Sequence, residues 1–225
     1  MAIMQLGRSV GEDHPPFIIA AVDCSGVEHI EEVLAAVDEA AHASCDGLKL
    51  TTVPWSWYPV LFDRAQARGL TLISSVGDER AVARLAELGV AAFEVFFDWA
   101  DFDLVISAAR TGKPLVLSVA NASAPQLGEV VALALSEGAP SVALVQRVVG
   151  AELSSFDELA RHGAVTGISH RAIDPVVVQA AVRRGARIVE VRIKPRRVSV
   201  LAQVVRDGEV AWAGLGMPAL SFTSN

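Results

Sequence analysis

Short runs of apolar and largely β-branched residues recur at regular intervals along most of the chain. Each is followed by a longer stretch in which apolar residues take helical spacing. The short runs predict strands, and the longer stretches predict amphipathic helices. Eight strands are predicted in this way, at residues 17–22, 47–51, 70–75, 92–97, 114–119, 142–146, 165–169 and 187–193. The clearest helical stretches are residues 28–43, 79–88, 127–136 and 175–184.

Glycine ends several of the helical stretches directly before the next strand. These residues are Gly69, Gly89, Gly112, Gly163 and Gly185. Glycine adopts the left-handed backbone conformation that commonly ends a helix, so these positions indicate turns from helix to strand. Strand–helix units joined by short turns form a parallel sheet. Eight such units predict a single small (β/α)8 TIM barrel, and the first strand lacks the G-x-G-x-x-G motif of an open doubly wound sheet.

The two ends of the chain depart from this alternation. We expect residues 1–15 to form an N-terminal extension, and residues 16–225 to form the barrel with an irregular C-terminal tail. Residues 198–205 fit either a short helix or a strand. The Asp207-Gly208 pair that follows is a common hairpin turn, here placed before residues 209–212.

Composition indicates an ordered, globular protein that needs no disulfide or metal to fold, since 52% of its 225 residues are hydrophobic. A formal net charge of −7 argues against nucleic acid or an anionic membrane as a partner. The sequence shows no secretory signal and no apolar run long enough to span a bilayer. Cys24 and Cys45 form no disulfide framework, so we expect a soluble, cytoplasmic protein.

Polar and charged residues gather at the predicted carboxyl ends of the strands, where barrels of this type carry their chemistry. Ionised groups shielded from water need partners, so a barrel kept only for stability would not need so many. The candidate acid–base residues are His170, Glu94, Glu190 and Asp23. The candidate substrate-binding residues are Lys49, Ser75, Arg147, Ser169, Arg171 and Arg192. We expect no cofactor.

Lys49 has three possible roles. It can hold an anionic substrate, or form a Schiff base if Arg171 and Arg192 depress its pKa. It can also pair inside the barrel with Glu94 or Glu190, which would make those carboxylates structural.

The other acid–base candidates also have structural alternatives. His170 is a usable general base if it faces the cavity, but the alternation of a strand can point it outward. Asp23 either takes part in acid–base chemistry or caps the helix that follows. Cys24 lies at a strand end but has no evident base beside it, and strand parity turns it toward the helices.

Aromatic residues lie in the loops after the second and fourth strands. They are Trp55, Trp57, Tyr58 and Trp99. Such rings either cover a ligand or bury a contact with a second copy of the chain, so a homo-oligomer stays open.

Several segments resemble the N-terminal barrel of the sialic acid synthases. They are Pro-Phe-Ile-Ile-Ala at 16–20, Asp-Gly-Leu-Lys-Leu at 46–50, Thr-Gly-Lys-Pro-Leu-Val-Leu-Ser at 111–118, and residues 167–169 and 185–190. The resemblance covers roughly residues 16–194. It implies an enzyme that condenses phosphoenolpyruvate with an amino-sugar aldehyde, using a divalent metal such as manganese and a C-terminal antifreeze-like domain. We expect this chain to lack that second domain.

The catalytic positions depart from the family pattern. The family's first-strand glutamate corresponds to Ala21 and its fourth-strand lysine to Glu94, whereas its second-strand lysine is retained as Lys49. Its two metal-binding histidines correspond to Arg171 and Arg192. A guanidinium has no lone pair to give a metal, so we expect no metal site. The two arginines are instead suited to grip a carboxylate or phosphate in bidentate fashion.

Together these features predict a metal-independent biosynthetic enzyme, an aldolase-like or synthase-like lyase or transferase. It would form or break a carbon–carbon bond in a small anionic keto or enol acid resembling phosphoenolpyruvate, with a sugar-like aldehyde as the second reactant. Two alternatives stay open: an inactive barrel that binds a ligand or a protein partner, and a different lyase or isomerase chemistry on the same barrel. A mouth plugged by Trp55, Trp57 or Trp99 would favour the binding protein, and an open polar pocket would favour the enzyme.

Overall fold

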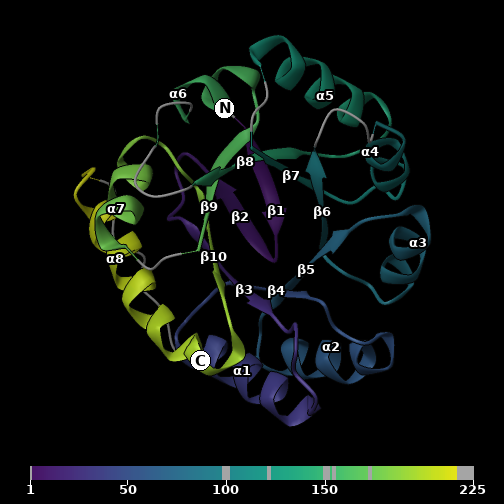
Figure 1. The fold of residues 1–225 in the computed structure, drawn as a ribbon. Coiled ribbons are helices and arrows are strands. Elements are labelled where there is room, and N and C mark those ends of the chain that lie inside the picture. The colour runs from purple at the N-terminus through teal and green to yellow at the C-terminus, as the bar shows by residue number, and fades with distance from the viewer. Residues whose placement is uncertain are drawn as a thin grey trace.

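Eight parallel strands close into a barrel in the order β10-β3-β4-β5-β6-β7-β8-β9 (Figure 1). The computed structural model describes residues 2–97, 102–120, 123–148, 153, 156–171 and 174–216. The barrel strands are β3 (Phe17–Asp23), β4 (Gly47–Thr51), β5 (Thr71–Val76), β6 (Ala92–Phe97), β7 (Leu115–Val119), β8 (Val142–Val148), β9 (Val165–His170) and β10 (Ile188–Ile193). Each overlaps a predicted strand, so the predicted (β/α)8 fold is confirmed.

Helices surround the barrel on its outside (Figure 1). They are α1 (Ile30–His42), α2 (Tyr58–Ala67), α3 (Glu79–Glu87), α4 (Phe102–Ala109), α5 (Ala124–Ser136), α6 (Phe156–Leu159), α7 (Pro175–Arg183) and α8 (Leu201–Ala213). Three short 3-10 segments join them: η1 (Trp55–Trp57), η2 (Ala160–His162) and η3 (Pro195–Val200). The five glycines predicted to end helices all have positive φ, with Gly69 at 74° and Gly185 at 102°. No described helix has the length and apolar character that crossing a membrane requires.

The first residues of the chain form an antiparallel hairpin of β1 (Ile3–Leu6) and β2 (Arg8–Gly11), which lies across the centre of the barrel in Figure 1. Met4, Leu6 and Val10 are fully buried and pack in one cluster with inward-facing apolar side chains of the barrel strands. Arg8 fixes the hairpin, because its Nε lies 2.6 Å from Oδ1 of Asp46. The segment expected as an extension therefore closes the amino-terminal end of the barrel.

The end of the described chain corrects one prediction. Asp207 and Gly208 lie inside α8, so the hairpin turn predicted there was wrong. Buried residues recur along α8 with helical spacing, and this amphipathic pattern outweighs the local turn preference of an Asp-Gly pair. Gly208 fits because a Cβ would come within 3.3 Å of Pro16 Cγ, so its absence lets α8 pack closely on the start of β3.

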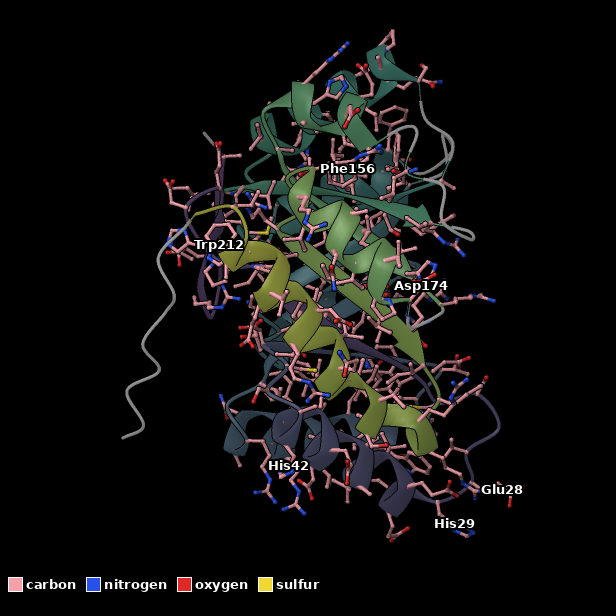
Figure 2. All side chains as sticks on the ribbon, turned by 90° about the vertical axis from the view of Figure 1, so that its left-hand side faces the viewer. Glu28, His29, His42, Phe156, Asp174 and Trp212 are labelled. Atoms are coloured by element: carbon pink, nitrogen blue, oxygen red, sulfur yellow. The ribbon has the colours of Figure 1, made fainter. Side chains whose placement is uncertain are left out.

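Helices α7 and α8 run side by side on one flank of the barrel (Figure 2). Asp174 caps α7 by accepting a hydrogen bond from the Val176 backbone N–H at 2.9 Å. Figure 2 shows Asp174 at the end of the barrel where Glu28 also lies, and Trp212 toward the opposite end. The helix starts, and thus the loops after the strands, gather at the carboxyl ends of the strands.

Candidate functional site

The carboxyl-terminal half of the barrel interior is a polar cavity of about 230 Å³. Side chains alternate along each strand, so Glu190 and Arg192 face inward while Val189 and Val191 pack against the helices. Seven of the predicted site residues line this cavity: Lys49, Ser75, Glu94, Arg147, Ser169, Glu190 and Arg192. Strands distant in sequence thus bring most of the predicted site together.

Lys49 is held between two buried carboxylates. Its Nζ lies 2.5 Å from Oε2 of Glu94 and also donates to Oε2 of Glu190. All three side chains are at most 6% exposed. Two hydroxyls complete the cluster: Ser75 donates to Glu94, and Ser169 donates to Oε1 of Glu190 at 2.7 Å. The pairing of Lys49 with the two glutamates, one of its three predicted roles, is therefore present.

The three charges shift one another's pKa values. Burial opposes the charge of Lys49, but Glu190 and Glu94 outweigh burial and raise its pKa above the ordinary value. Burial also opposes the charge of Glu94, but Lys49 outweighs it and lowers the pKa of Glu94. The pKa of Glu190 is raised, because burial and the charge of Glu94 outweigh the attraction of Lys49. Lys49 is thus a charged ammonium, which contradicts the depressed pKa that a Schiff base needs.

Two arginines line the outer part of the cavity. In the register of the sheet, Arg192 of β10 lies beside Ala21 of β3, and Ala21 lies beside Lys49 of β4. Arg147 lies over the ring of Phe96, with its Cζ 4.8 Å from the ring centroid. Burial, followed by the charges of Arg192 and Arg171, lowers the pKa of Arg147. Within the described part of the chain, neither Arg147 nor Arg192 forms an ion pair with a carboxylate. Their guanidinium groups therefore supply positive charge for a bound anion.

Three predicted site residues lie outside this cavity. His170 is the last residue of β9, adjacent to the inward-facing Ser169, so its buried side chain takes the outward alternative. Arg171 is exposed and does not line the cavity. Asp23 pairs with Lys194 at 2.9 Å, and its side chain is 42% exposed. Burial would raise its pKa, but bonds from Ser25 and Lys194 lower it to about 2.

Neither cysteine has the properties of a nucleophile. Cys24 is buried on the helix side of β3, and burial together with the charge of Asp23 raises its pKa to about 11. Burial and the charge of Asp46 raise the pKa of Cys45 to about 12. Both are therefore protonated thiols near neutral pH.

Among the described aromatic loop residues, Trp55 and Trp57 do not plug the cavity. Trp55 is 39% exposed, with the Cζ of Arg84 4.3 Å from its ring centroid and the Tyr58 ring 5.0 Å away. Trp57 packs against the core between strands and helices. Neither tryptophan lines the cavity. Trp99 lies outside the described residues.

Three lining residues were not among the predicted site residues: Thr51, Phe96 and Ser118. Thr51 and Phe96 each follow a predicted site residue by two positions, so strand parity places them on the same face. Counting two residues on from Lys49 and from Glu94 along their strands would have identified Thr51 and Phe96.

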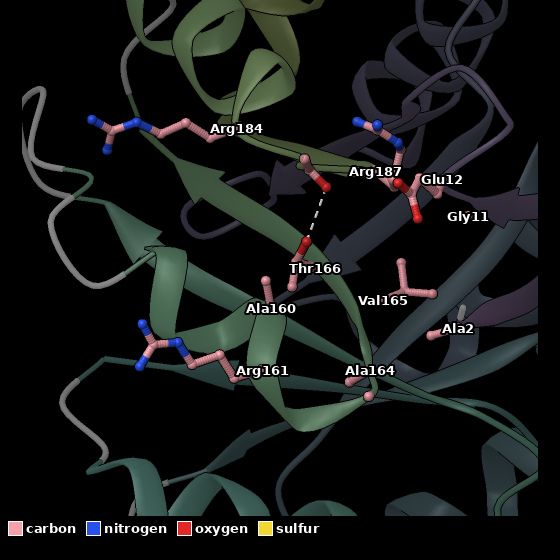
Figure 3. Close-up of a pocket in the computed structure, with 12 residues that line it drawn as sticks. Ala2, Gly11, Glu12, Ala160, Arg161, Ala164, Val165, Thr166, Arg184 and Arg187 are labelled. Atoms are coloured by element: carbon pink, nitrogen blue, oxygen red, sulfur yellow. Dashed lines mark hydrogen bonds between the residues drawn. The ribbon is translucent and has the colours of Figure 1, made fainter.

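A larger cavity of about 650 Å³ lies at the other end of the barrel, near the hairpin and the start of β9 (Figure 3). Thr166, at its wall, donates to the Gly185 carbonyl at 3.0 Å. Glu12 is the one carboxylate among its lining residues. It therefore lacks the paired acid and base groups of the polar cavity.

The residues of the polar cavity do not fit the metal that the resemblance implies. One of the two positions expected to hold a metal-binding histidine is Arg192, which lines the cavity as a cation. Across the described ranges, no three His, Cys, Asp or Glu side chains are grouped so that they could hold a metal ion. Lys49 already occupies the space between Glu94 and Glu190.

Comparison with known proteins identifies similar sequences. The model of the NeuB family matches residues 28–197. The spore coat polysaccharide biosynthesis protein SpsE of Bacillus subtilis is 24% identical over 234 residues, covering 84% of this chain and 63% of SpsE. The pseudaminic acid synthase of Helicobacter pylori is 26% identical over 148 residues, covering 62% of this chain and 44% of the synthase. The chain therefore spans less than two thirds of the length of either relative.

Solved structures agree on the fold. The B. subtilis SpsE structure has a TM-score of 0.83 at 22% identity and covers 98% of this chain and 76% of its own. The N-acetylneuraminic acid synthetase of Leptospira borgpetersenii has a TM-score of 0.82 at 20% identity and covers 99% of this chain and 93% of its own. A truncated 3-deoxy-D-arabino-heptulosonate 7-phosphate synthase of Thermotoga maritima has a TM-score of 0.79 at 15% identity and covers 96% of this chain and 93% of its own. These matches confirm the barrel, and together with the family model they confirm the predicted resemblance.

Proposed function

This chain belongs to the NeuB family, and on that premise we propose that it is a metal-independent enzyme that forms or breaks a carbon–carbon bond in a small anionic keto or enol acid. Its relatives, a spore coat polysaccharide biosynthesis protein and a pseudaminic acid synthase, support this general kind of reaction. One observation carries the proposal: Arg147 and Arg192 line the same cavity as the Lys49–Glu94–Glu190 cluster. The arginines, which can bind an anion, and Glu190, which can carry a proton, thus lie in one cavity at the carboxyl ends of the strands, where barrels of this type carry their active sites.

The arginines bind the substrate's acid group. A guanidinium binds a carboxylate through two parallel hydrogen bonds, which fixes the substrate's orientation as well as its position. The same charges stabilise the negative charge that develops on an enolate as the bond forms or breaks. Since the cavity residues do not fit a metal, fixed positive charge takes over the role that a Lewis acid would have.

Glu190 moves the proton. In the bond-forming direction its carboxylate removes a proton from the carbon beside the keto group. The resulting enolate carbon then attacks an aldehyde carbonyl, whose alkoxide oxygen takes the proton from Glu190 and so returns Glu190 to its carboxylate form. Ser169 holds the carboxylate in place, and the raised pKa brings Glu190 closer to working pH than an ordinary glutamate. Glu94 stays ionised and supplies the charge that raises the pKa of its neighbour.

Lys49 acts as a fixed cation in this mechanism. Its ammonium keeps two carboxylates 45 and 141 residues away in sequence within one small site. A protonated amine has no lone pair with which to attack a carbonyl, so the reaction proceeds without a Schiff base.

The inactive barrel is the competing function. Ala21 lies between Arg192 and Lys49 in the strand ladder, where the resembled family has a glutamate, and it offers no acid or base. Against this, Trp55 and Trp57 leave the cavity open, and Glu190 supplies a proton carrier. The enzyme is therefore the better supported function. Cytoplasmic location, a homo-oligomer, and phosphoenolpyruvate with a sugar-like aldehyde as reactants stay predictions.

The proposal is tested by hydrogen–deuterium exchange at C3 of pyruvate, 2-oxobutyrate and phenylpyruvate, followed by NMR in D₂O with excess EDTA. This exchange needs no second reactant. We expect the wild-type chain to catalyse exchange of at least one acid, Glu190→Gln to abolish it, and Glu12→Gln, an exposed carboxylate at the other end of the barrel, to preserve it. Binding without exchange would favour the inactive barrel. Exchange only after Mn²⁺ is added, or exchange that survives in Glu190→Gln, would overturn the mechanism.

A further inference from the structure

Phe96 presents an apolar ring inside an otherwise polar cavity. It lies on the inward face of β6, two residues beyond Glu94, and remains 41% exposed. Its neighbour Phe97 points outward and packs edge-on against Phe102 at 5.5 Å. A large ring left open at the mouth of a cavity offers a surface for the apolar part of a ligand.

The guanidinium of Arg147 lies over this ring, 4.8 Å from its centroid. An anion-binding group and an apolar face are therefore adjacent on neighbouring side chains. A ligand that contacts both carries its acid group close to a flat apolar surface.

The hydroxyl groups of the cavity are poorly placed to bind a sugar. Of the four hydroxyl side chains that line it among the described residues, Ser75 and Ser169 already donate to Glu94 and Glu190. In that part of the chain, Thr51 and Ser118 are the two hydroxyls left for a ligand. A polyol that enters such a cavity leaves several of its own hydroxyls without partners, and each unmade hydrogen bond costs affinity.

The charges of the cavity fit a ligand with one negative charge. Among the described lining residues, three cations face two carboxylates, which leaves one net positive charge when both carboxylates are ionised. Lys49 is shared between Glu94 and Glu190, so the free positive charge resides on Arg147 and Arg192. A phosphorylated acid carries additional negative charge that would face these two carboxylates and be repelled.

We propose that Phe96 and Arg147 select the substrate, and that this substrate is a small monoanionic 2-oxo acid with a flat apolar tail, aromatic or unsaturated. Its carboxylate binds Arg147 and Arg192 while its tail lies against the Phe96 ring. The cavity, at about 230 Å³, admits only a small acid of this class. This inference rests on the proposed function of the same site, whose substrate class it narrows.

The test is a calorimetric titration of the full chain, in EDTA, with pyruvate, phenylpyruvate and phosphoenolpyruvate. Phenylpyruvate should bind at least about 10-fold more tightly than pyruvate, because burial of its phenyl ring against Phe96 removes apolar surface from water. We expect phosphoenolpyruvate to bind more weakly than phenylpyruvate.

Variants separate the ring from the rest of the site. Phe96→Ala should bring the ratio of the Kd values for pyruvate and phenylpyruvate close to one, and Phe96→Tyr should keep the preference for phenylpyruvate. Trp55→Ala, an exposed aromatic outside the cavity, is the matched control and should change neither Kd. Equal binding of the two oxo acids, tighter binding of phosphoenolpyruvate, or a preference that survives in Phe96→Ala would overturn the inference and leave the proposed function standing. If none of the three acids binds, both fail.

Discussion

The two halves of the barrel interior are built from the same strands but differ in chemistry. At the amino-terminal end, inward residues such as Ile19 and Val116 pack with Met4 and Leu6 of the hairpin into an apolar cluster. Toward the carboxyl end, the inward positions become charged or hydroxylated and surround a cavity. On β10 the change takes two residues, from the apolar Ile188 to the carboxylate of Glu190. The fold thus keeps its stabilising core apart from its chemistry, along the barrel axis.

The two halves differ in what they contribute to stability. Burial of the apolar half stabilises the fold directly. In the polar half, desolvating Lys49, Glu94 and Glu190 offsets most of their mutual attraction, so the cluster adds little net stability. The contrast between the two halves can be broken by substitutions at either end.

The largest effect is expected from Lys49→Met. Removing the ammonium leaves two buried carboxylates without their partner, which costs about 3–5 kcal/mol in the free energy of unfolding. Urea denaturation at pH 7 measures this loss. The double variant with Glu94→Gln should recover part of it, because one buried negative charge is gone. A loss below about 1 kcal/mol in the single variant would show that the cluster is not tightly paired.

Leu6→Ala tests the apolar end and should cost about 3 kcal/mol, because it leaves a cavity in the cluster that the hairpin closes. We expect the Kd for pyruvate to be unchanged, because Leu6 lies at the opposite end of the barrel. Thermal denaturation and calorimetry measure the two quantities separately. A large change in affinity with little change in stability would contradict the separation of the two halves.

Arg192→Gln should weaken pyruvate binding and leave stability nearly unchanged, the reverse of Leu6→Ala. Losing a charge-assisted hydrogen bond to the anion costs roughly 1.5–3 kcal/mol, or about 10- to 150-fold in Kd, while the melting temperature changes little. In the wild-type chain the guanidinium groups stay protonated between pH 6 and 9, so any fall in affinity as the pH rises should come from ionisation of Glu190, whose pKa is raised, and should be absent in Glu190→Gln. A pH step that survives in Glu190→Gln would count against the arginines as the anion site.

Asp23→Asn should have the smallest effect, below about 1 kcal/mol, because the pair with Lys194 is largely exposed and screened by solvent. The pKa of Asp23 is lowered from 3.8 to about 2, so its contribution is present above pH 3.8 and lost as the pH falls through 2. Comparing the acid denaturation of the variant and the wild type measures it. Loss of pyruvate binding in this variant would show that Asp23 takes part in binding the substrate.

The strands, and the side chains that face into the barrel, could be predicted wherever the pattern within a single strand determines them. The alternation that identifies β10 also turns Glu190 and Arg192 inward, and it would have identified Phe96 had it been applied beyond Glu94. Contacts between strands were not decided in this way: the sequence offered the pairing of Lys49 with Glu94 or Glu190 only as one of three roles. Lys49 reaches Glu190 across β3, which carries the small Ala21 at the neighbouring position in the ladder, and this depends on packing between segments far apart in sequence.

Local patterns failed where tertiary packing outweighed them. The Asp207-Gly208 pair has the sequence of a hairpin turn, but the apolar face of α8 buries both residues within a helix. The outward direction of His170 followed from strand parity once Ser169 was seen to face the cavity.

The central claim is that the polar half of the barrel binds a small anion through Arg147 and Arg192 without a metal. The most direct measurement is calorimetric titration of the full chain with pyruvate, once in excess EDTA and once with added Mn²⁺. We expect the same Kd in both conditions. Binding that appears only with Mn²⁺ would contradict the claim.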